Sequence, residues 1–263
     1  MKLKELESGS LVSNLTPVPP FLRLAAAPKR ELEQYVTSAH LASRMLYTAE
    51  SQFADLNDKH VLDLGCGCAV LSIGAVMLGA WLSLFWIGTR LRNIAMVELT
   101  LNFWDVCSDV LSVDIDSDAL EIAKQNVEEI DMEDEIELVN ARIGDIAEDS
   151  SIGKGLPSLE EYLANRDRER RFDTVVMNPP FGSWRKGIDM AFLESACELA
   201  KTAVYSLNKS STRDYILKKA KTFGFEGTVI AEMKYDLPKT MAHHSKKSVD
   251  ILVDMWRFER ISG

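Results

Sequence analysis

The sequence predicts an α/β protein with a doubly wound, mostly parallel sheet of seven strands and an antiparallel C-terminal strand. Short apolar segments of strand character alternate with segments of helical periodicity, as in consecutive β-α-β units. Two longer alternating segments then close the chain without a helix between them. The expected strands lie at 60–64, 110–116, 135–139, 173–177, 204–207, 227–233 and 248–257. The expected helices lie at 38–50, 71–78, 117–126, 158–164, 190–200 and 214–222.

The domain organisation follows from the length and from two breaks in this alternation. Residues 1–30 are expected to hold a short charged helix and an irregular segment, and 31–263 to form one domain. Insertions are expected at 81–108, which is rich in apolar residues, and at 148–170, which is polar and interpreted as an exposed excursion. Thr37 or Ser38 would cap the first helix of the domain, and Ser117 the third.

The net charge of −10 argues against a protein that binds nucleic acid with its whole surface. It leaves room for a local basic patch and for a partner that supplies positive charge. The basic loops 209–213 and 243–247 are either such a patch or ordinary solvated surface. The adjacent His243 and His244 lack cysteine or acidic partners at a usual spacing, so no metal site is expected.

Cysteine usage indicates a reducing, intracellular compartment. The four cysteines are Cys66, Cys68, Cys107 and Cys197. None belongs to a C-x-x-C pair, so neither a disulfide framework nor a zinc site is expected. The charged N-terminus differs from a secretory signal, and Arg90, Arg92 and Glu98 interrupt the apolar runs of 81–108, which argues against a membrane span. We expect a protein of the nucleus and cytoplasm without a membrane partner.

A glycine turn joins the first strand to the next helix, in the segment Asp63-Leu64-Gly65-Cys66-Gly67-Cys68. Gly65 and Gly67 allow the backbone to approach a ligand, and the following helix begins with unsatisfied N–H groups. Val70 stands where the dinucleotide fingerprint G-x-G-x-x-G has its third glycine, which disfavours a nicotinamide dehydrogenase.

The spacing after this turn identifies an insertion. Asp114 ends the second strand and lies 49 residues beyond Gly65, whereas a ribose-binding acid usually follows the turn by about 20 residues. Residues 81–108 account for the excess. They form either a hydrophobic hairpin that docks on the domain or a partner, or a retained intron in the gene model. We favour the retained intron, because so many exposed apolar residues promote aggregation.

An Asn-Pro-Pro-Phe corner follows the fourth strand at Asn178-Pro179-Pro180-Phe181. The prolines cannot continue a central strand, so the corner lies at the strand's carboxyl end, where open α/β sheets bind ligands. The Asn178 amide oxygen and the Pro179 carbonyl can both accept hydrogen bonds from one planar amino group, and Phe181 can stack on a base. An ordinary turn is the alternative. The glycine turn, Asp114 and Asp145 are expected at the same rim, which favours a nucleoside-bearing cofactor there.

These motifs together resemble the S-adenosylmethionine-dependent amino-methyltransferases, whose class I members have a Rossmann-like fold. The sequence is more closely similar to the methyltransferase-like protein 5 family. That closer similarity rests on residues 32–35, 40–48, 190–193, 202–213 and 246–250. The resemblance covers most of the chain outside 9–28, 81–108 and 148–170. Two residues depart from the family pattern, because Val36 replaces a proline and Ala69 a glycine.

The resemblance implies methyl transfer from S-adenosylmethionine to N6 of an adenosine in small-subunit (18S) ribosomal RNA. It also implies a heterodimer with a small zinc-containing activator subunit. The catalytic residues would be Asn178, Pro179, Pro180 and Phe181. The cofactor-binding residues would be Gln34, Thr37, Gly65, Cys68, Val70, Asp114 and Asp145, with Asp114 at the ribose and Asp145 at the adenine.

Two other functions remain open from the sequence. A protein glutamine-N5 methyltransferase normally has Asn-Pro-Pro-Tyr at this corner and a helical substrate domain in front. Phe181 and the short N-terminal region argue against it. A catalytically inactive scaffold that stabilises a partner is the second alternative, because 81–108 is inserted beside the cofactor turn.

Overall fold

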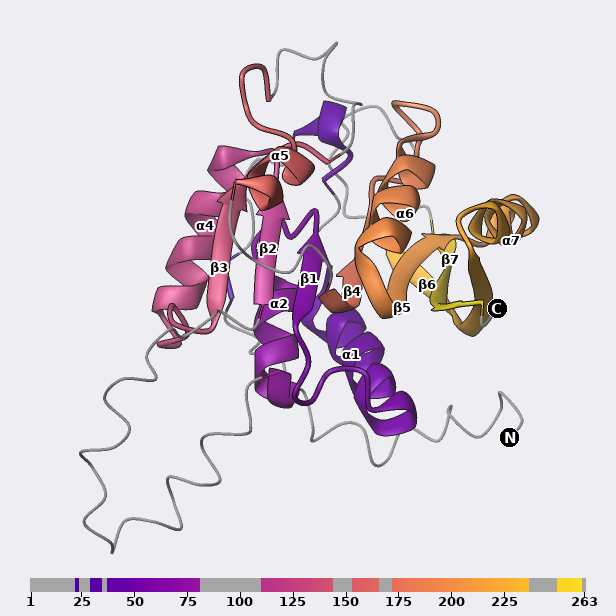
Figure 1. Cartoon of the computed structure of the whole chain (residues 1–263), viewed down its shortest axis with the longest axis horizontal. Coiled ribbons are helices and arrows are strands. Elements are labelled where there is room, and N and C mark those ends of the chain that lie inside the picture. The colour runs from indigo at the N-terminus through magenta and orange to yellow at the C-terminus, as the bar shows by residue number, and fades with distance from the viewer. Residues whose placement is uncertain are drawn as a thin grey trace, which may run out of the picture.

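The computed structural model describes residues 22–23, 29–34, 37–80, 110–143, 153–165, 172–236 and 250–261. Within these ranges seven strands form one sheet in the order β3-β2-β1-β4-β5-β7-β6 (Figure 1). The strands are β1 (Val61–Leu64), β2 (Val110–Asp114), β3 (Ile136–Asn140), β4 (Phe172–Met177), β5 (Ala200–Lys209), β6 (Phe225–Asp236) and β7 (Asp250–Arg260). Strand β7 runs antiparallel to both β5 and β6, and the other neighbours are parallel. The predicted fold class is confirmed.

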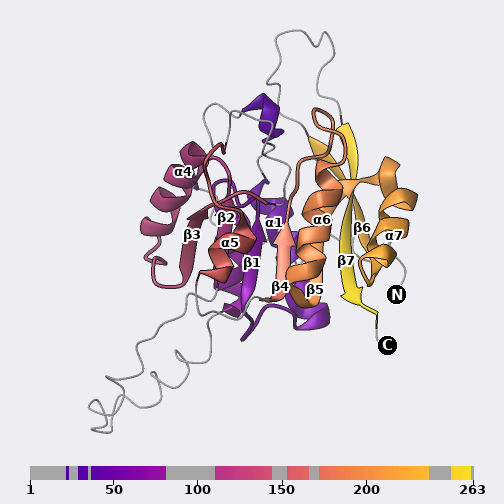
Figure 2. The ribbon, with the colours of Figure 1, turned by 45° about the horizontal axis from the view of Figure 1, so that its top comes forward.

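Helices cover both faces of the sheet. The helical elements are η3 (Arg30–Leu32), α1 (Ala39–Phe53), α2 (Val70–Ala75), η4 (Val76–Ala80), α4 (Ser117–Glu128), α5 (Leu159–Ala164), α6 (Ile188–Leu199), η6 (Ser210–Thr212) and α7 (Arg213–Thr222). Helices α1, α2 and α4 contribute to one apolar cluster and α5, α6 and α7 to the other. Figure 2 shows α5 and α6 in front of the strands and η3 above the ends of β1 and β2.

The central strands are buried on both sides because alternate residues face different helix layers. Val61 of β1 belongs to the cluster with α1 and α2, and its neighbour Leu62 belongs to the cluster with α5 and α6. All four residues of β1 and all five of β2 are buried. These short, apolar segments therefore form the inner strands of the sheet. Because they run parallel, their carboxyl ends lie at the same rim.

Two predicted caps differ in outcome. Ser38 caps α1, since its hydroxyl accepts a hydrogen bond from the Leu41 N–H at 3.2 Å. Ser117 was the wrong cap for α4, because Ser117 is already helical and Asp116 accepts from the Asp118 N–H at 3.1 Å. Both serine and aspartate cap helices well, and the backbone of Asp116 is extended while that of Ser117 is helical.

Two segments differ from the sequence expectation. The helix predicted over 71–78 is regular only to Ala75 and continues as a π-helical turn to Ala80, with Gly79 at φ 98°. The 148–170 segment is not wholly exposed, because Leu159 and Leu163 of α5 are 0% and 2% exposed. The predicted features at 1–21, 81–108, Asp145 and 243–247 lie outside the described residues.

Within the described ranges, no helix combines the length and apolar character that a membrane crossing requires. The same ranges contain no cluster of three or more His, Cys, Asp or Glu side chains arranged to hold a metal ion.

Candidate active site at the carboxyl ends of the strands

Strand pairing brings three predicted motifs to one rim of the sheet. Leu64, the last residue of β1, pairs with Val113 on one side and with Met177 on the other. The glycine turn after Leu64, Asp114 after Val113 and Asn178 after Met177 are therefore neighbours in space. Open α/β sheets bind ligands at such a rim, where neighbouring strands connect in opposite directions.

The glycine turn has the geometry of a close backbone approach. Gly65 has φ 73°, and its N–H donates to the Val113 carbonyl at 2.9 Å. A Cβ at Gly65 would lie 3.0 Å from the Phe192 ring, whereas a Cβ at Gly67 would meet nothing within 4 Å. The backbone at Gly67 therefore faces open space, where a ligand can approach closely.

Cys68 and Val70, two predicted cofactor contacts, flank Ala69 and are largely buried, at 6% and 5% exposed. Ala69 has φ 64°, a left-handed conformation that costs a non-glycine residue about 1 kcal/mol. The alanine at this position therefore keeps the turn under strain. Asn126 of α4 supports the same turn, because its amide donates to the Cys68 carbonyl at 2.9 Å.

Asp114 is buried at the end of β2 and is held by backbone donors. The Gly67 N–H donates to Oδ2 at 2.8 Å and the Asp116 N–H to Oδ1 at 2.9 Å. Burial raises the pKa of Asp114, against the effect of these two hydrogen bonds. A carboxylate has about four acceptor positions, so Asp114 retains capacity for hydroxyl donors. The placement of Asp114 beside the glycine turn fits the predicted ribose contact.

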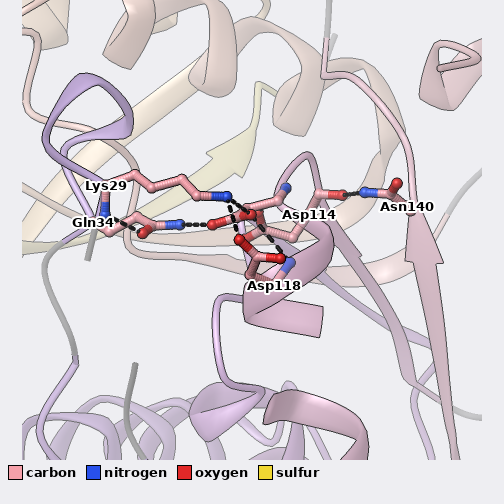
Figure 3. Close-up of polar contacts among 6 residues, drawn as sticks. Lys29, Gln34, Asp114, Asp118 and Asn140 are labelled. Carbon is pink, nitrogen blue, oxygen red and sulfur yellow. Dashed lines mark hydrogen bonds and ion pairs between the residues drawn. The ribbon is translucent and has the colours of Figure 1, made fainter. Parts of the chain in front are cut away.

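Asp116 connects the N-terminal segment to the rim. Figure 3 shows Lys29 and Gln34 of that segment beside Asp114 and Asp118. The two carboxylate oxygens of Asp116 accept from Lys29 Nζ at 2.5 Å and from Gln34 Nε2 at 2.6 Å, and Lys29 also pairs with Asp118 at 2.8 Å. Burial acts to raise the pKa of Asp116, but the hydrogen bonds from Lys29 and Gln34 lower it below its ordinary value. Gln34, a predicted cofactor contact, is thus placed at the rim with its amide donor on Asp116.

Asp63 lies behind the glycine turn and is fully buried. Its Oδ2 accepts from the Ser72 N–H at 3.1 Å and from the Ser72 hydroxyl at 2.6 Å. Its Oδ1 is buried without a hydrogen-bond partner among the described residues. Burial raises the pKa of Asp63 from its ordinary value of 3.8 to about 7, and the charge of Asp114 adds to the increase. The site therefore contains a buried acceptor directly beneath the turn.

Cys66, in the glycine turn, is buried. Burial, followed by the charges of Asp114 and Asp63, raises the pKa of its thiol well above the ordinary value. This environment disfavours the thiolate form that a nucleophile or a metal ligand requires.

The Asn-Pro-Pro-Phe corner leaves the sheet directly after β4, as predicted. The Asn178 amide nitrogen donates to the Thr37 hydroxyl at 2.9 Å, so the acceptor end of the amide faces away from Thr37. Pro179 is buried and Pro180 half-buried, which holds the backbone carbonyls of the corner in place. Thr37 thus accepts the Asn178 amide hydrogen bond in this structure, and its predicted cofactor contact stays a prediction.

Phe181 is only 6% exposed and belongs to the cluster that includes α1 and α2. The Lys209 ammonium lies over its ring, 5.8 Å from the centroid. A base that stacks on that face must displace the Lys209 side chain. The stacking role of Phe181 stays a prediction, and the structure adds this condition to it.

The residues at the rim fit a nucleoside-bearing cofactor. Three features support the fit: the open approach at Gly67, the Asp114 carboxylate, and the unpartnered buried oxygen of Asp63. The predicted adenine contact Asp145 and the Val36 position lie outside the described residues.

The sequence reasoning missed Asp63, Asp116 and Lys29. The second acid of Asp114-Ile115-Asp116 was a signal for Asp116. No local pattern distinguishes Lys29, because its partner is 87 residues away in the chain.

The fold and the rim together define a class of protein. A seven-stranded sheet with β7 antiparallel, a glycine turn after β1, an acid after β2 and Asn-Pro-Pro-Phe after β4 are the features of a class I methyltransferase that acts on an amino group.

Comparison with known proteins identifies the family within this class. The chain is 43% identical to the rRNA N(6)-adenosine-methyltransferase METTL5 of Danio rerio, over 98% of this chain and 99% of that protein. It is 39% identical to the corresponding enzyme of Drosophila melanogaster, over 88% of each chain. No protein-family model matches the chain. The chain belongs to the METTL5 family of rRNA N6-adenosine-methyltransferases.

Solved structures agree with this assignment. A crystal structure of a putative RNA methyltransferase from Pyrococcus horikoshii superposes with a TM-score of 0.65 at 30% identity, covering 92% of this chain and 94% of that one. A precorrin-6y C5,15-methyltransferase from Geobacter metallireducens, at 14% identity and a TM-score of 0.51, shares the fold over 89% of this chain and 93% of that one.

Proposed function

We propose that this chain transfers a methyl group from S-adenosylmethionine to N6 of an adenosine in small-subunit (18S) ribosomal RNA. The main support for the proposal is the orientation of the Asn178 side chain, which lies beside the glycine turn. Its amide nitrogen donates a hydrogen bond to the Thr37 hydroxyl at 2.9 Å, so its amide oxygen faces away from Thr37. An amide acceptor and a rigid proline carbonyl at this position suit a planar amino group. The names of the animal relatives support adenosine in ribosomal RNA as the substrate.

In this proposal the chain orients the substrate amine and requires no general base. S-adenosylmethionine, when bound, supplies an electrophilic methyl group. The Asn178 amide oxygen and the Pro179 carbonyl accept hydrogen bonds from the adenine amino group, which draws its lone pair out of conjugation with the ring. The amine loses its proton after it becomes cationic, so a side chain with a pKa near 7 is unnecessary. Holding the two reactants together provides much of the rate.

Replacing Asn178 tests this assignment. In Asn178→Ala the rate of methyl transfer should fall by roughly 10²- to 10³-fold, since one preorganised acceptor is lost. Affinity for S-adenosylmethionine, measured by calorimetry, should stay within about twofold because the cofactor turn is untouched. The matched control is Asn165→Ala, an exposed asparagine at the end of α5. An unchanged level of N6-methyladenosine in ribosomal RNA from cells with only the Asn178→Ala protein contradicts the proposal.

Cofactor binding separates this enzyme from a scaffold. S-adenosylmethionine is titrated into the full chain and into a variant that lacks residues 81–108. Binding by either form supports an enzyme. Absence of binding in both forms contradicts it, and favours a scaffold role.

We also propose a heterodimer with a small zinc-containing activator subunit, in the nucleus and cytoplasm. The support is the sequence resemblance to the family and the net charge of −10, which leaves a partner to supply positive charge toward RNA. Co-expression with a candidate subunit should raise the yield of soluble protein and its affinity for RNA. Equal yield and affinity with and without the subunit contradict the heterodimer.

A further inference from the structure

The loop at 182–187, which follows the Asn-Pro-Pro-Phe corner, presents a tryptophan to solvent. Trp184 is 62% exposed, the largest exposure of any large hydrophobic side chain among the described residues. Large aromatic side chains are usually buried, and an exposed one beside a substrate site is a candidate for stacking.

The backbone around Trp184 is fixed from two sides. Its N–H donates to Glu33 Oε1 at 2.5 Å, and Glu33 is buried in the N-terminal segment. On the other side the hydroxyl of Ser183 accepts from Lys209 Nζ at 2.5 Å. Gly182 and Gly187 bound the loop in left-handed conformations, at φ 68° and 85°. The exposed indole is therefore carried on a preorganised backbone, which reduces the ordering cost when a ligand binds.

The loop lies beside the position predicted for the substrate amine. Trp184 follows Phe181 by three residues, a reach of at most about 10 Å. Lys209, which anchors the loop, also covers the Phe181 ring. A nucleotide chain whose adenosine reaches Asn178 must pass next to this loop.

The charges on the loop suit a nucleic acid strand. Arg185 and Lys186 follow Trp184 directly, and Lys209 adds a third cation. Of the acids beside the loop, Glu33 is buried and Asp189 is half-buried near Gly182. Cations beside an exposed aromatic ring are the arrangement by which proteins bind single strands, with stacking on bases and ion pairing to phosphates.

We infer that Trp184 stacks on the base of a nucleotide adjacent to the target adenosine, while Arg185 and Lys186 contact the neighbouring phosphates. This inference rests on the proposed RNA substrate. Stacking on an exposed ring is tolerant of base identity, so Trp184 contributes affinity for the strand and leaves the choice of adenine to the corner at Asn178.

The test uses the full chain and a short fluorescein-labelled single-stranded RNA with one central adenosine. In Trp184→Ala the Kd for this RNA, measured by fluorescence anisotropy, should rise about tenfold. The KM for RNA should rise equally, while kcat and the Kd for S-adenosylmethionine stay within about twofold. Trp184→Phe keeps a stacking face and should bind within about threefold of the unaltered chain.

Tyr215→Ala is the matched control, because Tyr215 is another exposed aromatic residue, at 51%, on α7. Wild-type RNA affinity in Trp184→Ala overturns the inference, as does an equal loss in Tyr215→Ala. Loss of co-purification with a protein partner at unchanged RNA affinity assigns Trp184 to a protein interface and also overturns it. If the unaltered chain binds the RNA through Trp184 but methylates no adenosine, the proposed function fails and the stacking role stands.

Discussion

Buried carboxylates occur in two settings in this fold, and the settings differ in what balances the charge. Asp55 and Asp254 are 4% and 0% exposed and each is paired with an arginine. Arg257 lies 3.0 Å from Asp55, and Arg213 lies 2.7 Å from Asp254. Asp63 and Asp114 are equally buried, at 0% and 8% exposed, but lie at the ligand rim. No ion-pair partner of either rim acid is found among the described residues.

The difference indicates which acids are structural. Asp254 accepts two hydrogen bonds from the Arg213 guanidinium and one from Ser210, so its acceptor capacity is used within the protein. Among the described residues, Asp63 and Asp114 accept from backbone N–H groups and one serine hydroxyl. Burial raises the pKa of both. Asp63 and Asp114 thus lack a cationic partner among the described residues, which costs stability. Asp114, at the end of β2, keeps acceptor positions for a ligand that brings its own donors.

The largest expected effect is on the arginine-paired side. Asp55→Asn leaves the Arg257 guanidinium, 13% exposed, without its buried counter-charge, and weakens the hydrogen bond that Tyr205 donates to Asp55 at 2.7 Å. The free energy of unfolding should fall by about 3 to 5 kcal/mol in urea denaturation. Glu259→Gln removes the exposed partner of the same arginine and should cost about 1 kcal/mol at most. If Asp55→Asn and Glu259→Gln lowered the free energy of unfolding equally, burial would not distinguish the Arg257–Asp55 pair from the Arg257–Glu259 pair.

At Asp63, substitution is expected to raise the free energy of unfolding relative to wild type, by less than Asp55→Asn lowers it. Its pKa is raised from 3.8 to about 7 on folding, so the folded state holds this proton more tightly than the unfolded state. The contribution of Asp63 to the free energy of unfolding therefore falls as pH rises from about 4 to 7. Asp63→Asn removes this fall, and its stability relative to wild type should increase over that window by at most about 4 kcal/mol.

Asp116→Asn is the control for the direction of this pH dependence, because the pKa of Asp116 is shifted in the opposite direction to that of Asp63. Hydrogen bonds from Lys29 and Gln34 outweigh burial and lower the pKa of Asp116, so its contribution is present above the ordinary pKa and lost as pH falls. The stability of Asp116→Asn relative to wild type should therefore decrease as pH rises through the acidic range. Urea denaturation at a series of pH values measures both variants. A parallel pH dependence of the two variants contradicts the assigned directions.

The smallest expected effect is on cofactor affinity. Asp114→Asn keeps one carbonyl acceptor for the Gly67 N–H but loses the charge that a ribose hydroxyl would meet. The Kd for S-adenosylmethionine should rise about 10- to 100-fold in calorimetry. The free energy of unfolding should fall by about 1 to 3 kcal/mol, because one of the two backbone N–H groups that donate to Asp114 loses its acceptor. Unchanged affinity would remove Asp114 from the binding site and would weaken the distinction between rim and structural acids.

Much of this fold was predictable because its signals are local. The prolines at 179 and 180 end a strand wherever they occur, and apolar segments such as Val61–Leu64 read as inner strands. The motifs at Gly65, Asp114 and Asn178 met at one rim as predicted, because the carboxyl ends of neighbouring parallel strands lie at the same edge. The cap of α4 was misassigned, since Asp116 and Ser117 are both good caps and the backbone chooses between them.

The sequence by itself determined the order of strands and helices, the glycine turn and the corner at Asn178, since each depends on residues that are close in the chain. The tertiary structure alone decided the partners of the charges. Lys29 and Gln34 reach Asp116 across 87 and 82 residues, and Arg257 reaches Asp55 across 202. It also decided that Asn178 donates to Thr37 and that Asp63 is buried without a cationic partner among the described residues. Burial and long-range pairing are properties of the packed chain, so no local pattern encodes them.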